Sequence, residues 1–144
     1  MTLLIAYTLA AVFAVLSLVH VYWSLGGKAG CDAAVPKVPG KTGEMRPAFV
    51  PTPAGTFKVA VVLWVIATLV CLRAGLGLPA ITHGALQWFL SAVALGMFLR
   101  AIGDFKAVGF FKRIRGSTFA RRDTWAYSPL CVLLGLGLLA VAWG

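Results

Sequence analysis

The chain has 144 residues, of which 60% are hydrophobic and only 12% are charged, and its formal net charge is +9. Soluble domains carry about a quarter charged residues, so this composition excludes a soluble globular domain and an intrinsically disordered chain. It also excludes a large catalytic domain outside a membrane, because no stretch between the uncharged apolar runs is long enough to form one.

Four transmembrane helices are predicted, because four apolar stretches, each with at most one Lys or Arg near its end, are about long enough to cross the hydrocarbon core of a bilayer. They lie at about residues 3–23, 56–72, 81–100 and 125–143. The predicted fold class is therefore all-α, a four-helix membrane bundle that forms a single domain over residues 1–144. The pair Ser128-Pro129 favours a helix start near residue 125, since proline is tolerated in the first helical turn. Ala92 and Gly96 indicate a close helix contact in the third span.

Two polar loops, at about residues 26–55 and 101–124, connect these spans. Five of the seven prolines lie in the first loop, which favours an extended, turn-rich segment without regular helix. Four spans place both termini on one side, and twelve of the thirteen Lys and Arg residues lie on the other side, in or beside the loops. The positive-inside rule then predicts that both loops lie in the cytoplasm and that both termini lie outside it.

No metal or cofactor motif is present in the sequence. The three cysteines, Cys31, Cys71 and Cys131, form no Cys-x-x-Cys pair, which argues against a disulfide framework or a zinc site. A phosphate-binding glycine loop and a nucleophile elbow are also missing. We therefore expect no metal and no cofactor.

His20 and Trp23 are the first candidate site residues. They are three residues apart at the loop end of the first span and share one helix face. An ionisable side chain inside a span is a functional candidate by default. The alternative is that His20 only hydrogen-bonds a carbonyl near the interface.

Arg100 and Asp104 form a second candidate pair. Arg100 ends an uncharged run, and on a continued helix it could pair with Asp104 four residues later. The alternative, which we favour, is that Asp104 and Asp123 neutralise nearby arginines and fix the second loop.

The second loop interleaves aromatic and basic side chains from Asp104 to Arg122. Such segments lie in the interface of anionic lipid. Basic and aromatic residues also alternate in RNA-binding proteins, but a position between two membrane spans favours lipid. The expected partners are anionic membrane lipids and a second copy of the chain, and no nucleic acid is expected.

Several short runs of residues are together typical of one known family. They are His20–Trp23 with Gly26-Gly27, Phe49–Pro51, Arg100–Phe105, Val108–Arg113, Phe119–Arg121, Asp123-Thr124 and Tyr127–Leu130. In these runs the chain resembles an uncharacterised family of small bacterial four-helix inner-membrane proteins, a domain of unknown function. The resemblance extends over nearly the whole chain and implies the four-span fold in a bacterial inner membrane, with both termini periplasmic, but it implies no activity.

Three functions remain open from the sequence. The first is a module that binds or moves an amphipathic anion, such as a lipid or prenyl phosphate, at the cytoplasmic mouth of the bundle. Its expected binding residues are His20, Trp23, Arg46, Arg100, Asp104, Lys112 and Arg115. The second is a membrane-embedded enzyme on a lipid substrate, with His20 and Asp104 as acid–base residues. The third is an accessory subunit of a larger complex, which predicts a filled bundle without a pocket.

Overall fold

The computed structural model of the chain describes every residue except residue 78, and it contains four long helices. They are α1 (Thr2–Ser24), α3 (Pro53–Ala74), α4 (Gly84–Ile102) and a last helix built from α5 (Thr118–Arg122), the π-helical turn η1 (Asp123–Tyr127) and α6 (Ser128–Trp143). All four are long and apolar enough to cross a membrane. The predicted all-α, four-span fold class is confirmed.

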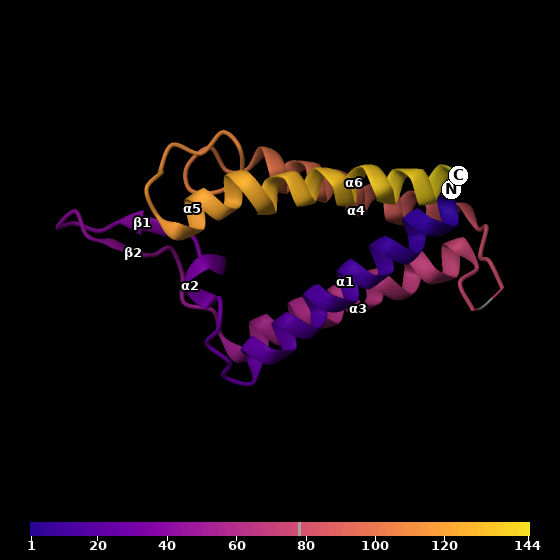
Figure 1. Cartoon of the computed structure of the whole chain (residues 1–144), viewed down its shortest axis with the longest axis horizontal. Helices are drawn as coiled ribbons and strands as arrows, with labels where there is room; N and C mark the ends of the chain where they lie inside the picture. Colours follow the sequence, from indigo (N-terminus) through magenta and orange to yellow (C-terminus); the bar gives the residue numbers. More distant parts are fainter. Residues whose placement is uncertain (78) are drawn as a thin grey trace.

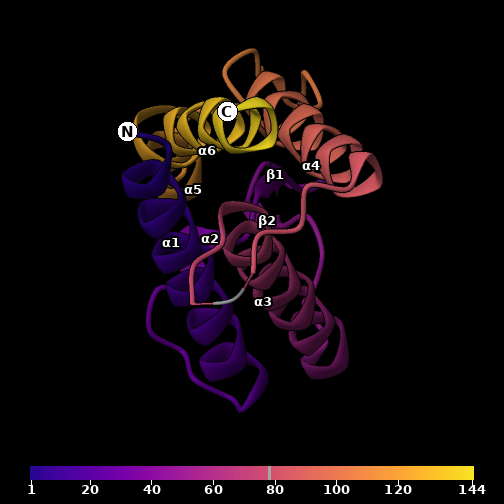
Figure 2. The ribbon, with the colours of Figure 1, turned by 90° about the vertical axis from the view of Figure 1, so that its right-hand side faces the viewer.

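The four helices form two pairs that together resemble a V. Helix α1 packs along α3, and α4 packs along α6 (Figure 2). Figure 1 shows that the pairs meet where the two termini lie and diverge toward the long loops. We call these two regions the terminal end and the loop end. The pairs are joined mainly by contacts of α1 and α3 with α6.

The apolar core joins the two pairs and is continuous between them. Its fully buried side chains come from all four helices and include Phe13, Val70, Leu90 and Leu138. At the terminal end, Arg73 Nη2 donates to the carbonyl of Ala142 over 2.7 Å. A cation at the carboxyl end of a helix stabilises that end, so this contact ties α3 to the last turn of α6.

The first loop is more ordered than its prolines suggested. It contains the one-turn helix α2 (Cys31–Ala34) and a short antiparallel hairpin of β1 (Lys37–Pro39) and β2 (Met45–Pro47), in which Val38 faces Arg46. The prediction of no regular helix was wrong for α2. This turn begins before Pro36, so the prolines do not interrupt it.

The fourth helix begins at Thr118, seven residues before the predicted start. Ser117 caps it, because its Oγ accepts from the Ala120 N–H over 3.0 Å. Pro129 was expected to mark a helix start, but the helix passes through it. The turn before Pro129 is widened, and the Ser128 N–H bonds to the carbonyl of Asp123 five residues earlier. Such π-helical turns accommodate interruptions of the regular hydrogen-bond ladder.

The close helix contacts occur at glycines of α6 and not at Gly96. A Cβ at Gly135 would lie 2.7 Å from the Phe98 ring, and one at Gly137 would lie 3.0 Å from Leu9. Apart from its chain neighbours and the backbone of its own helix, no atom of the described residues lies within 4 Å of a Cβ placed at Gly96. The predicted contact at Gly96 was therefore wrong.

Candidate functional site

Helix α2 connects the two helix pairs at the loop end. The Tyr127 hydroxyl donates to the carbonyl of Ala33 over 2.9 Å, and the Tyr127 ring lies 6.0 Å from that of Phe119. Because Phe119 is buried, this contact fixes α2 against the start of the last helix. Two pockets lie in this region and share no lining residue.

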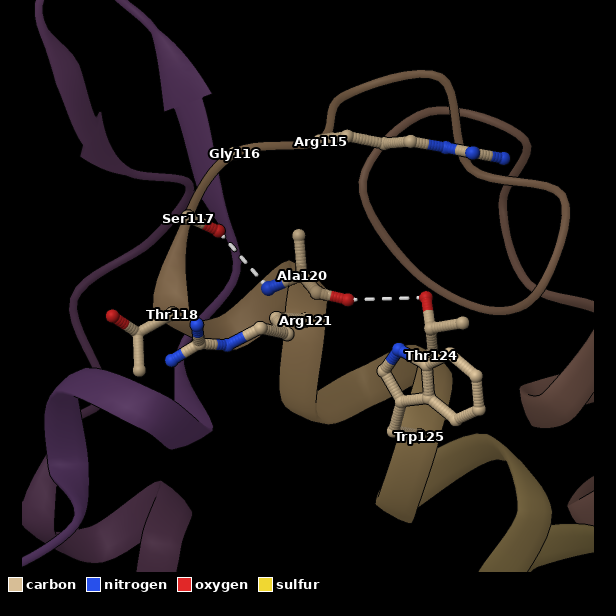
Figure 3. Close-up of a pocket in the computed structure, with 8 residues that line it drawn as sticks. All are labelled: Arg115, Gly116, Ser117, Thr118, Ala120, Arg121, Thr124 and Trp125. Carbon is tan, nitrogen blue, oxygen red and sulfur yellow. Dashed lines mark hydrogen bonds between the residues drawn. The ribbon is translucent and has the colours of Figure 1, made fainter.

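The first pocket, which we call the basic pocket, has a volume of about 530 Å³. It is lined by Arg115, Gly116, Ser117, Thr118, Ala120, Arg121, Thr124 and Trp125. Figure 3 shows Arg121 beside Thr118 and Arg115 on the opposite side of Ala120. The lining contains two guanidinium groups, three hydroxyl groups and no carboxylate. Arginine suits phosphate and carboxylate oxygens because its donors form a fork.

A buried ion cluster lies beside this pocket, centred on Asp123. The Asp123 carboxylate has 0% exposure and accepts from Arg100 Nη2 over 2.8 Å and from Lys112 Nζ over 3.0 Å. The backbone N–H of Gly109 donates to the same carboxylate over 2.7 Å. Lys112 Nζ also donates over 2.7 Å to the hydroxyl of Thr124, which lines the basic pocket. The cluster therefore holds the second loop against the last helix.

These contacts confirm the favoured alternative for Asp123, which neutralises Arg100 and fixes the loop. The pairing of Arg100 with Asp104 that helical spacing suggested does not form in the structure. Helix α4 ends at Ile102, and Gly103 has a φ of 90°, so Asp104 does not continue the helix face of Arg100.

Asp104 instead organises the turn that follows α4. Its Oδ1 accepts the backbone N–H groups of Lys106, Ala107 and Val108 over 2.8–2.9 Å. Partial burial alone would raise the pKa of the Asp104 carboxyl, but these hydrogen bonds outweigh it and leave the pKa lowered from 3.8. A carboxylate that is ionised and bonded in this way is a poor general acid or base near neutral pH.

The second pocket, which we call the His20 pocket, has a volume of about 590 Å³. It is formed by the end of α1, by α2 and by the segment Phe49–Pro53 with the first turns of α3. His20 Nδ1 lies 2.7 Å from the carbonyl of Leu16, and the His20 ring meets that of Trp23 edge to face at 5.1 Å. No carboxylate lines this pocket.

The structure therefore does not bring the seven predicted binding residues together. His20 and Trp23 line the His20 pocket, and Arg115 lines the basic pocket. Arg100 and Lys112 belong to the buried cluster. Asp104 holds its own turn, and Arg46 is exposed on β2.

Sequence reasoning missed the polar residues that complete the basic pocket, namely Ser117, Thr118, Arg121, Thr124 and Trp125. Arg121 was noted only as part of the basic segment. The signal that could have found the others is Ser117, a typical helix cap, because an earlier helix start places Arg121 and Thr124 on the last helix.

Metal binding finds no support in the described part of the chain, where no three His, Cys, Asp or Glu side chains are grouped closely enough to hold an ion.

The comparisons with known proteins identify the chain by family alone. Residues 13–138 match a family model described as a protein of unknown function, DUF3995. No curated protein and no solved structure matches the chain.

Proposed function

We propose that this chain, which belongs to the DUF3995 family, binds the anionic headgroup of an amphipathic ligand, a lipid or prenyl phosphate, in the basic pocket. The observation that carries this proposal is the lining of that pocket, which contains Arg115, Arg121 and no acid. The hydroxyl groups of Ser117 and Thr118 can also donate there, whereas the Thr124 hydroxyl already donates to the carbonyl of Ala120. Such a set of donors is complementary to phosphate oxygens.

The charge balance around the pocket supports an anionic ligand. Asp123 is occupied by Arg100 and Lys112 inside the protein. The rest of the second loop and the start of the last helix expose five basic side chains and one acid. They are Lys106, Arg113, Arg115, Arg121 and Arg122, with Asp104 as the acid. This surface attracts anions, and the pocket gives them a defined place to bind.

The position of the pocket supports a ligand that also has an apolar part. Trp125 is 81% exposed and lies where the apolar helix α6 begins to emerge from the polar region. Tryptophan is enriched at the headgroup level of membranes. A lipid whose headgroup enters the basic pocket can keep its chains in the bilayer, beside the outward faces of the helices.

We further propose that the loop end lies in the cytoplasm of a bacterial cell and that both termini are periplasmic. Arg73 bonds to the last turn of α6 at the terminal end, and the other twelve Lys and Arg residues lie in or beside the two long loops. This asymmetry follows the positive-inside rule for inner-membrane proteins.

The test is native mass spectrometry of the full chain from phosphatidylcholine nanodiscs that contain a small share of phosphatidylglycerol. The variant R115Q/R121Q should retain roughly tenfold less anionic lipid than the parent, since charge-assisted hydrogen bonds each contribute about 1.5–3 kcal/mol and solvent at this open pocket screens part of that.

The matched control is R113Q/R122Q, which removes the same charge from the same surface but changes no pocket residue. It should retain lipid nearly as the parent does. If the two double variants lose lipid equally, the basic surface acts as a general anchor and the pocket proposal is wrong.

The geometry favours this proposal over the other two hypotheses. An acid–base pair of His20 and Asp104 finds no support, because Asp104 lines neither pocket and bonds to its own turn. An accessory subunit would have a filled bundle, whereas pockets are present at the loop end.

A further inference from the structure

The His20 pocket differs in chemistry from the basic pocket, although both lie at the loop end. Apart from His20, its lining contains no ionisable acid or base other than the Cys31 thiol, and most of it is Trp, Phe, Val, Ala and Pro. Desolvating a charged headgroup against such a lining is costly. The occupant that fits is therefore a neutral, largely apolar molecule.

Each polar side chain in the pocket already makes a hydrogen bond to the backbone. Thr52 Oγ1 accepts from the Gly55 N–H, and Thr56 Oγ1 donates to the carbonyl of Thr52. The Cys31 thiol donates to the carbonyl of Gly27. Among the described residues, the Thr52 hydroxyl proton has no acceptor, and the second ring nitrogen of His20, Nε2, has no hydrogen-bond partner.

The Leu16 contact determines which proton form His20 takes when neutral. A carbonyl oxygen can only accept, so Nδ1 carries the proton that it donates to Leu16 over 2.7 Å. In a neutral imidazole the other nitrogen is then an acceptor. Nε2 is therefore a hydrogen-bond acceptor in a largely apolar pocket. A ligand with one hydroxyl group could donate to it.

We infer that the His20 pocket binds a neutral lipid-soluble alcohol, an apolar chain with one hydroxyl group that donates to His20 Nε2. The volume of about 590 Å³ lies in the range of small-molecule pockets. This site is independent of the proposed anion site, because the two pockets share no lining residue.

Trp23 provides a direct readout, since it lines the pocket and contacts the His20 ring. The variant W64F/W88F/W125F/W143F leaves Trp23 as the only indole and changes side chains that are all more than half exposed. The full chain carrying these changes, in phosphatidylcholine nanodiscs, is titrated with ω-bromododecanol, whose bromine quenches indole fluorescence on contact. The matched probe is its methyl ether, which lacks the donor.

The inference predicts saturable quenching by the alcohol and roughly five- to tenfold weaker binding of the ether, the effect of one lost hydrogen bond. His20→Leu should weaken the binding of the alcohol by a similar factor, so that the alcohol no longer binds more tightly than the ether. His20→Gln keeps an acceptor oxygen and should restore part of that advantage. If His20→Leu fails to fold, Val59→Phe, which narrows the pocket and leaves the His20 side chain in place, should weaken the binding of both probes.

Two results would overturn the inference. One is that the alcohol and its ether quench Trp23 with equal affinity in the parent chain. The other is that dodecyl phosphate displaces the alcohol from Trp23 at lower concentration than dodecanol does, because the pocket would then favour a charged headgroup.

Discussion

At the scale of single residues, Asp123 determines how the loop end is held together. It has 0% exposure and is bonded to two cations and a backbone N–H. A buried ion pair contributes little compared with well-packed apolar residues, but removing one partner leaves an uncompensated charge. Losing Asp123 would leave Lys112, which is 2% exposed, without its counter-charge.

Asp123→Asn should therefore lower the free energy of unfolding by about 3–5 kcal/mol, the usual cost of breaking a buried pair. The measurement is unfolding of the full chain in mixed micelles with increasing dodecyl sulfate, followed by circular dichroism. Asp32→Asn is the control, because that carboxylate is 97% exposed and lies 3.8 Å from Lys37. It should leave unfolding unchanged, and an equally mild effect of Asp123→Asn would contradict the role given to the cluster.

The hydrogen bonds of Asp104 predict how the stability of its turn depends on pH. Its folded pKa is lowered from 3.8 by three backbone hydrogen bonds, which together outweigh the effect of burial. A carboxyl with a lowered pKa stabilises the fold above its unfolded value, and this contribution is lost as the pH falls through the folded pKa. The turn at residues 104–108 should stay ordered at and above pH 3.8 and loosen below it.

Carbon-13 spectra of the Asp side chains in the full chain can test this directly. The Asp104 carboxyl should titrate below 3.8, and the amide protons of Lys106 and Val108 should exchange faster once it is protonated. Asp104→Asn should show fast exchange at neutral pH. A midpoint for Asp104 above 3.8 would be the opposite of what the geometry predicts.

The roles of these two acids show what sequence could and could not provide. Both were expected to neutralise arginines and fix the loop, and Asp123 does so. Asp104 fixes its turn through backbone N–H groups instead. Spacing alone could not separate Asp104 from Asp123 as the partner of Arg100, because that depends on where α4 ends, and Gly103 ends it with a positive φ.

At the scale of elements, the helices followed from the lengths of the apolar runs. The predicted and observed bounds of the first three spans agree within three residues at each end. The start of the fourth helix was predicted too late. The sequence around Thr118 is basic, and Pro129 favoured a helix start near residue 125. The structure extends that helix through a π-helical turn, a local adjustment that residue patterns do not reveal.

Helix packing provides a prediction at this scale. Gly135→Leu should lower the free energy of unfolding by about 1–3 kcal/mol, as overpacking does, because its side chain would meet the Phe98 ring. Gly96→Leu is the control, since the space around Gly96 is open. Dodecyl sulfate unfolding of both variants should separate them, and equal effects would argue against the α4–α6 contact.

Small residues at a spacing of four mark a helix face but do not say which face meets a partner. Ala92 and Gly96 have that spacing, but both are exposed. The glycines that lie close to side chains of other helices, Gly135 and Gly137, are two residues apart. Which helices approach closely is a property of the whole packing, in which α6 contacts both α1 and α4.

At the scale of the whole molecule, the V arrangement explains why one predicted site became two. One hypothesis from the sequence was that polar residues of the first span and of the two long loops converge at one mouth of the bundle. The helix pairs diverge toward the loop end, so residues from α1 and residues from the second loop line separate pockets. Between the two pairs, α2 bonds to the last helix through the Tyr127 hydroxyl and the Ala33 carbonyl, a contact that the sequence does not indicate.

Orientation in the membrane is also a property of the whole chain. A reporter fused after Gly144 should read as periplasmic, because the twelve basic residues at the loop end should keep that end in the cytoplasm. A second reporter inserted at Gly43, in the exposed hairpin turn between β1 and β2, should read as cytoplasmic. The reverse pattern would reverse the proposed topology. Self-association stays a prediction that cross-linking in nanodiscs can test.

The measurement that tests the account most directly is a crossed titration of two ligands against two variants of the full chain. Dodecyl phosphate and ω-bromododecanol are each titrated against R115Q/R121Q and His20→Leu in phosphatidylcholine nanodiscs. If the two pockets are independent, R115Q/R121Q should weaken only the binding of dodecyl phosphate. His20→Leu should weaken only the binding of ω-bromododecanol. If both variants weaken both ligands, the loop end holds one shared site, and the division into two pockets is contradicted.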